Sequence, residues 1–352
     1  MSSLSQKELI QLIQSVFPKL DGDRQLALLV DVPNQSADDT DLWKTRRSFA
    51  ESWAAQLKEA QSELDLEVRL VGYASVDSNN ADLPLEFYPV DSLPDVSSNF
   101  GKDSIPAADF FSSTQIIMAP TQYSATAPLK VAASRYGFRA ATMPGFSEAM
   151  IPALRIDYER VNRRCQLLRK KLNDAEEAKV EFESDGETVV VHFDLRHRHA
   201  HASSGRFPDP GTAGNLPSGE TYIVPYEGEL DIPSETHGVL PVQFDDEVVL
   251  FRVKDNKATE VLVTDHRAAN SRIIWTTNPP IAIWRNWDSD FFPISDSDPS
   301  APCCWMKNWA FMWHSDAAII SAVLSDPRIL HHRQLWFIST VSIFRKPSPL
   351  SG

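Results

Sequence analysis

A carboxylate at the start of a short apolar run is the side chain in this sequence best placed for metal or ligand chemistry. Glu220 follows the turn-forming residues Pro217-Ser218-Gly219 and precedes Thr221 to Val224, whose β-branched and aromatic side chains are typical of a strand. Because proline restricts the backbone and glycine relaxes it, the turn should aim the Glu220 side chain. Carboxylate oxygen is a metal ligand, so Glu220 is the first candidate site residue.

The turn and several other segments resemble one known family. Asn215-Leu216-Pro217-Ser218-Gly219-Glu220 is similar to the Asn-Leu-Pro-x-Gly-Glu turn of the aminopeptidase T-like metallopeptidases and the related iron-dependent dihydroxypyridine ring-opening dioxygenases, where the glutamate binds metal. Further similar segments are Ser124–Pro128, Tyr136–Arg139, Thr142–Gly145 and Thr277–Pro279. The resemblance covers about residues 25 to 280 and implies an amino-terminal α/β domain, followed by a β-rich domain that carries a metal cleft.

The same resemblance shows where this chain departs from the family's metal ligands. The family's second ligand, a glutamate before the Asn-Pro pair, is matched by Arg272, and two further ligand positions are matched by Asn308 and Gln334. Of the implied ligands, Glu220 and His332 remain, fewer than the three usual in catalytic zinc sites. Because arginine stays protonated, Arg272 would repel a dication and pair with Glu220 instead.

These substitutions favour a non-catalytic protein that keeps an aminopeptidase-like cleft and binds a peptide or small molecule without a metal cofactor. The expected ligand-binding residues are Glu220, Tyr222, Arg272, Asn308, Trp309, His332 and Gln334. Degenerate relatives of this kind resemble accessory proteins of ribosomal peptide natural-product pathways such as crocagin, so other pathway proteins are expected partners. The resemblance also implies a homodimer.

An active metal-dependent aminopeptidase or mononuclear iron dioxygenase is the alternative, if the correspondence of the carboxy-terminal part shifts by a few residues. A zinc, cobalt or iron ion would then be held by Glu220, His314, Asp316, His331 and His332. The metal would polarise a carbonyl or activate water, and Glu227 or Glu229 would serve as general base. The Glu220→Ala substitution should abolish metal uptake and turnover under this alternative alone.

Composition limits the classes of protein and partner. The 352 residues are 42% hydrophobic and suffice for two domains, and no stretch approaches the roughly 20 apolar residues of a membrane-spanning helix. A formal charge of −14 argues against a nucleic-acid partner, because phosphate binding requires a basic face. The three cysteines argue against a disulfide framework. We expect a cytoplasmic protein whose first residues are no secretory signal.

The first half of the chain alternates the apolar patterns of strands and helices. Strands are expected at 26–30, 67–73, 85–88, 115–119 and 138–143, and helices at 4–17, 41–64 and 128–136. Such alternation favours a doubly wound, largely parallel sheet. A charged helix at 156–178 should lead into a second domain, which places the two domains at residues 1–175 and 176–352.

From residue 180 the pattern changes to short alternating runs. Ser184-Asp185-Gly186 and Asp255-Asn256 each separate two such runs, which predicts two β-hairpins and a β-rich second domain. The expected fold class is therefore α/β plus α+β. Seven of the nine tryptophans follow residue 270, and aromatic side chains at this density form a core, a subunit interface or a surface on which a ligand stacks.

Two further clusters could do chemistry but have simpler interpretations. Arg196-His197-Arg198-His199-Ala200-His201 would place three histidines on one face of an extended strand, able to hold a metal. The interleaved arginines, with no carboxylate among them, favour a polar loop or sheet edge. Cys303-Cys304 with His331-His332 would pair a thiolate with a base, but nothing in the sequence brings them together.

Overall fold

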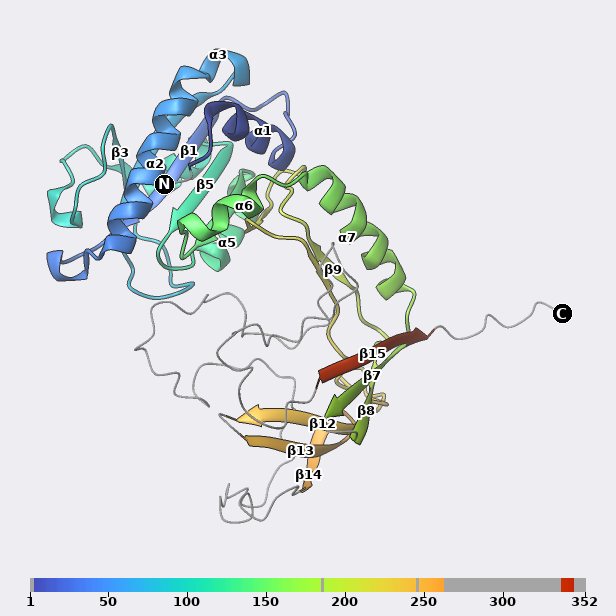
Figure 1. Ribbon diagram of the computed structural model, residues 1–352. Helices are drawn as coiled ribbons and strands as arrows, with labels where there is room; N and C mark the ends of the chain where they lie inside the picture. Colours follow the sequence, from blue (N-terminus) through green and yellow to red (C-terminus); the bar gives the residue numbers. More distant parts are fainter. Residues whose placement is uncertain (1–2, 185–186, 245–246, 263–336, 345–352) are drawn as a thin grey trace. The chain divides into compact units, whose positions relative to one another are not determined.

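The chain folds into two units, each with its own hydrophobic core. The computed structural model describes residues 3–184, 187–244, 247–262 and 337–344 (Figure 1). The described residues of the first unit lie within Met1–Arg163 and Ser203–Gly219, and those of the second lie within Arg164–Ala202 and from Glu220 onward. The sequence predicts one boundary, at residue 175. In the structure the first unit extends to Arg163 and also contains a later segment, Ser203–Gly219.

A seven-stranded sheet in the order β10-β6-β5-β1-β2-β3-β4 forms the centre of the first unit. Its strands are β1 (Gln25–Val32), β2 (Glu67–Ala74), β3 (Glu86–Val90), β4 (Ile105–Pro106), β5 (Ile116–Thr121), β6 (Arg139–Pro144) and β10 (Ala213–Asn215). Strands β10, β6, β5, β1 and β2 pair in parallel, and β3 and β4 add antiparallel pairs at one edge. The predicted parallel, doubly wound sheet is therefore confirmed.

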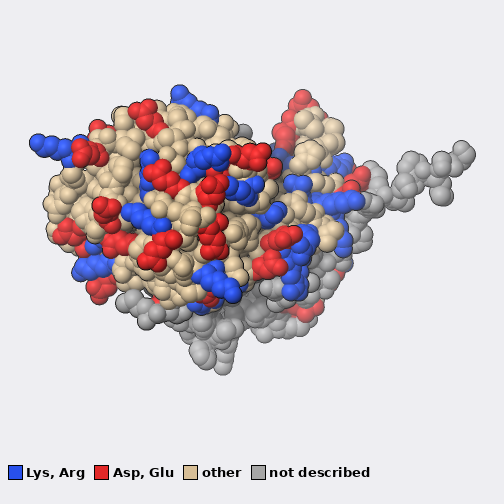
Figure 2. All heavy atoms as spheres, turned by 90° about the horizontal axis from the view of Figure 1, so that it is seen from above, with Lys and Arg blue, Asp and Glu red and all other residues tan. Residues whose placement is uncertain are grey.

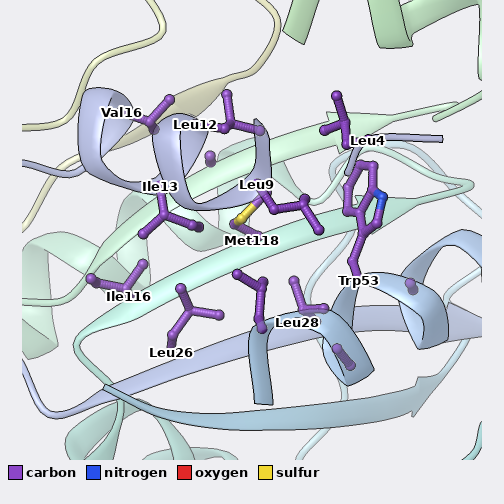
Figure 3. Packing of buried hydrophobic residues seen from close by; sticks show 14 of the residues in the cluster. Leu4, Leu9, Leu12, Ile13, Val16, Leu26, Leu28, Trp53, Ile116 and Met118 are labelled. Carbon is purple, nitrogen blue, oxygen red and sulfur yellow. The ribbon is translucent and has the colours of Figure 1, made fainter. Parts of the chain in front are cut away.

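Helices cover both faces of this sheet because its central strands are apolar on both sides. They are α1 (Gln6–Val16), α2 (Asp41–Glu59), α3 (Gln61–Leu64), α4 (Ala107–Ser113), α5 (Thr126–Tyr136) and α6 (Ile151–Leu154), with short 3-10 helices at Ser36–Asp38, Ser97–Asn99 and Glu148–Met150. Helices α1 and α2 pack on Leu26 and Leu28 of β1 (Figure 3). Helices α4 and α5 pack on the other face, against Ala27 and Leu29.

Local sequence signals mark several of these helix ends. The backbone N–H of Ser5 donates to the Glu8 carboxylate at 2.8 Å and the Ser5 hydroxyl accepts from the Glu8 N–H, a reciprocal cap that starts α1. Helix α5 ends at Gly137, whose φ of 83° lies in the left-handed region that glycine adopts without strain. Both ends fall within a few residues of the predicted ones.

The second unit contains a six-stranded antiparallel sheet in the order β14-β13-β12-β8-β7-β15. Its strands are β7 (Glu177–Ser184), β8 (Glu187–Asp194), β12 (His237–Phe244), β13 (Glu247–Lys254), β14 (Lys257–Leu262) and β15 (Phe337–Phe344). Both predicted hairpins are present, β7–β8 and β13–β14. Asp255 and Asn256 have φ values of 53° and 59°, as expected of a two-residue hairpin turn. The second unit is therefore β-rich, as predicted.

Alternation along these strands gives the sheet one apolar and one polar face. Val180, Val191, Leu240 and Val253 point into the core of the second unit, together with Leu172. Leu172 belongs to α7 (Tyr158–Asn173), the predicted charged helix, which passes from the first unit into the second. A separate two-stranded sheet joins β9 (His201–Ser203) to β11 (Glu220–Tyr222).

The surface mixes charges of both signs. In the view of Figure 2, lysine and arginine side chains are interspersed with aspartate and glutamate over the described residues. None of the helices in the described part of the chain combines the length and the apolar composition that crossing a membrane would require.

Candidate functional site around Glu220

The turn that precedes Glu220 is fastened to segments that lie far away in the sequence. The Thr126 hydroxyl donates to Asn215 Oδ1 at 2.9 Å, and the Thr142 hydroxyl lies 3.1 Å from the same oxygen. The backbone N–H of Leu216 donates to the Thr142 carbonyl at 2.8 Å. Three of the segments that carry the family resemblance are therefore side by side in the first unit.

The middle of the turn is held by a second set of contacts. The Ser218 hydroxyl donates to the Ser203 carbonyl at 2.7 Å, and the two serine hydroxyls are 2.8 Å apart. Leu216 is buried, and its peptide bond to Pro217 is cis. The backbone that leads to Glu220 is thus fixed at both ends of the turn, in agreement with the sequence-based expectation.

Glu220 begins strand β11, where the sequence predicts a strand. Because side chains alternate along a strand, Glu220 and Tyr222 share one face while Thr221 points to the other. Thr221 is fully buried, and its hydroxyl donates to the Cys165 carbonyl of α7 at 3.1 Å. This buried contact orients the strand so that the half-buried Glu220 and Tyr222 face outward.

Charge and aromatic surface meet on this outward face. The Tyr222 ring stacks on His201 of the paired strand, with ring centroids 5.3 Å apart. Burial, followed by the charge of Glu220, raises the pKa of Tyr222, so its phenol stays protonated at neutral pH. Burial likewise raises the pKa of Cys165, which makes its thiol a poor nucleophile. The arrangement offers a carboxylate beside a stacked aromatic pair.

The two glutamates considered as general bases lie in the loop after β11. Glu229 forms an ion pair with Arg198 at 2.6 Å, and its carboxylate also accepts the backbone N–H of Glu227 at 3.0 Å. Arg198 donates in addition to the Pro225 carbonyl at 3.1 Å. Glu229 therefore holds this loop in place, and Glu227 takes part in that contact through its backbone.

The three histidines of residues 196–201 do not line one face of an extended strand, so that interpretation is wrong and the polar loop is correct. The chain turns at Arg196, and His197 has a φ of 62°. Arg196 stabilises this turn because its guanidinium forms ion pairs with Asp194 and with Glu235, each at 2.7 Å. Although burial opposes it, bonding from Arg196 and from backbone N–H groups lowers the pKa of Asp194. Both carboxylates lie outside residues 196–201, so the sequence of that segment alone could not predict these ion pairs.

Several predicted site residues lie outside the described residues. They are Arg272, Asn308, Trp309, His314, Asp316, His331, His332 and Gln334, together with Cys303-Cys304 and the tryptophans after residue 270. Glu220, Tyr222, Glu227 and Glu229 lie within them. Among the residues that the structure describes, no group of three or more His, Cys, Asp or Glu side chains is arranged to hold a metal ion.

A buried ionisable pair in the first unit was not anticipated from the sequence. Asp31 lies near the carboxyl end of β1, where the strand order reverses between β1 and β5, a common place for ligands in such sheets. Its carboxylate accepts the backbone N–H groups of Gln122 at 2.8 Å and Tyr123 at 3.1 Å. Burial raises the pKa of Asp31 to about 6, against the opposing charge of Arg46. An acid that ends a continuous apolar run was the available signal.

Comparison with known proteins gives one solved structure to report. No protein-family profile matches the chain, and no curated protein matches it either. The structure of 2,5-dihydroxypyridine dioxygenase from Pseudomonas putida KT2440 is similar, with a TM-score of 0.45 and 17% sequence identity over 74% of this chain and 69% of that one. The class defined by the fold itself is a doubly wound α/β unit with a second unit built on antiparallel strands.

Proposed function

We propose that this protein binds a peptide or a small organic molecule without transforming it, through the outward face of β11. The observation that supports this proposal is the half-buried carboxylate of Glu220 on the same face as the stacked Tyr222–His201 pair. A carboxylate forms charge-assisted hydrogen bonds with a protonated amine, and an aromatic pair contacts an apolar or cationic group. The amino-terminal residue of a peptide can supply both a protonated amine for the carboxylate and a side chain that contacts the aromatic pair.

The ligand positions of the resembling family support a binding role in preference to catalysis. Arg272, Asn308 and Gln334 stand where that family carries metal ligands, and none of the three side chains supplies an anionic or imidazole donor. From the same resemblance we propose that the protein is accessory to ribosomal peptide maturation, and that it acts in the cytoplasm as a homodimer. The second candidate is the metal-dependent aminopeptidase or iron dioxygenase, with Glu220 as a ligand.

Peptide binding tests the first candidate directly. We would titrate fluorescently labelled aromatic peptides with free or acetylated amino ends into the whole protein. A hydrogen bond to a charged group contributes roughly 1.5–3 kcal/mol, so Glu220→Ala should weaken binding of the free-amine peptides at least about tenfold. The acetylated peptides should bind equally to both proteins, and Glu227→Ala is the matched control.

Metal content and turnover test the second candidate. The protein, purified without chelator, is assayed for zinc, cobalt and iron, for hydrolysis of aminoacyl p-nitroanilides, and for oxidation of 2,5-dihydroxypyridine with added Fe²⁺. We expect no metal and no turnover that depend on Glu220. Turnover that disappears in Glu220→Ala would overturn the binding proposal and establish the enzyme. Stoichiometric metal that is lost in the same variant would overturn binding without a metal.

A further inference from the structure

Two histidines face each other across neighbouring strands of the second unit. His192 of β8 and His237 of β12 are directly paired in the antiparallel register. Their rings are stacked with centroids 4.8 Å apart and planes within 1° of parallel. The pair lies on the polar side of the sheet, opposite the core that contains Val191 and Leu240. His237 is exposed and His192 is half-buried.

Both rings already have one nitrogen bonded to an oxygen. His192 Nδ1 lies 2.8 Å from the Glu177 carboxylate, and His237 Nδ1 lies 2.8 Å from the Glu235 carbonyl. An ionised carboxylate and a backbone carbonyl only accept hydrogen bonds, so each Nδ1 carries the proton. In a neutral imidazole the other nitrogen then holds the lone pair. Each Nε2 therefore carries the lone pair that is able to bind a metal ion.

We propose that His192 and His237 form a two-histidine site for a transition-metal ion such as Zn²⁺ or Ni²⁺, with water as the remaining ligands. Imidazole suits these ions, and a ligating histidine usually donates its other N–H to a carboxylate or carbonyl, as both rings do here. Metal–nitrogen bonds of about 2 Å require the stacked rings to tilt toward each other. Of the two rings, that of His237 is the exposed one, so we expect His237 to make this adjustment.

The charges around the pair are balanced. Lys179 of β7 is the register partner of His192, and its ammonium pairs with Glu181 at 2.5 Å. Lys254 of β13 is the partner of His237 and is exposed, so its ammonium can extend into water. Glu177 adds a negative charge next to His192. A bound ion would link β8 to β12 in the middle of the sheet and stabilise the second unit.

Titration of the whole protein with NiCl₂ by isothermal calorimetry tests this site. We expect one ion per chain, with affinity at least tenfold lower in His192→Ala and in His237→Ala. Exposed His199 provides the matched control, and His199→Ala should bind as the unmodified protein does. Glu177→Gln should lower the affinity roughly tenfold by weakening the bond that orients His192. Ni²⁺ should also raise the melting temperature, except in the two alanine variants.

Absence of saturable binding, or binding that survives both alanine substitutions, would overturn the site. His237→Gln keeps a polar exposed side chain and serves if His237→Ala folds poorly. Metal that is lost in Glu220→Ala but kept in His237→Ala would instead lie at the Glu220 position. The two metal questions are therefore answered separately.

Discussion

At the scale of single residues, the first unit carries an ionisable pair whose burial has a cost. Asp31 and Arg46 are 1% and 2% exposed, and burial lowers the pKa of Arg46 while it raises that of Asp31. Arg46 Nε donates to the Phe146 carbonyl at 3.2 Å, but within the described residues its Nη1 has no hydrogen-bond partner. A buried charge destabilises the fold unless its surroundings compensate. The stability of the protein should therefore depend on pH through the ionisation of Asp31.

Asp31 should make the protein less stable as the pH rises from about 4 to 6. Its pKa is about 6 in the folded chain and 3.8 for an ordinary aspartate, so between these values the folded state binds the extra proton. The contribution of Asp31 to the free energy of unfolding is therefore fully present below about pH 4. It falls by on the order of 3 kcal/mol as the pH rises and the carboxylate ionises in the folded chain. Urea unfolding at a series of pH values measures this slope.

Asp31→Asn removes the titration and should flatten that slope. Its absolute stability will differ, because the amide NH₂ faces the N–H groups of Gln122 and Tyr123, so the slope is the quantity to compare. The exposed Asp21→Asn is the matched control. An unchanged slope in Asp31→Asn would show that Asp31 is not the responsible group.

At the scale of elements, the join between β8 and β12 depends on a glycine. Gly238 has a φ of 134°, and a Cβ there would lie 2.7 Å from Val191 Cα and closer still to the Val190 carbonyl oxygen. The neighbouring register pair is His192 with His237. A side chain at position 238 would therefore push the two strands apart as well as strain the backbone.

Gly238→Ala should destabilise the second unit by about 3 kcal/mol or more, since backbone strain and contact with main-chain atoms both oppose it. Gly22→Ala is the control, because a Cβ on Gly22 meets nothing within 4 Å. Chemical denaturation followed by circular dichroism measures the difference. Equal stability of the two variants would contradict this account of the join.

Regular elements could be predicted from the sequence because their own residues specify them. The apolar run of β1 and the positive-φ turn at Asp255-Asn256 gave correct strands and a correct hairpin. The three-residue strand β10 has no such pattern, because its pairing partner β6 determines it. The setting of Glu220 was foreseen in its turn and strand. The stacking of His201 on Tyr222 was not foreseen, because these residues are far apart in the sequence and meet only where strands β9 and β11 pair.

At the scale of the whole molecule, two separate cores imply two cooperative units. Two clusters of buried residues pack on the two faces of the parallel sheet, and a third packs on the apolar face of the antiparallel sheet. Large chains with more than one core commonly depart from two-state unfolding. Stability changes should then stay within the unit that contains the substitution.

Differential scanning calorimetry should resolve two transitions. We expect Gly238→Ala to lower the midpoint of one transition and Asp31→Asn to shift the other, because the two residues belong to different units. A single transition that moves with both substitutions would show that the units unfold together. The measurement uses the full chain.

The return of residues 203–219 to the first unit affects how the protein is made. Strand β10 covers the edge of β6, and the Leu216 side chain enters the first core. On the ribosome, the amino-terminal unit therefore cannot finish folding until Gly219, 65 residues beyond the end of α6 at Leu154, has emerged. Until then the outer edge of β6 has unpaired backbone groups that other nascent chains can pair with. This edge favours aggregation unless a chaperone shields it.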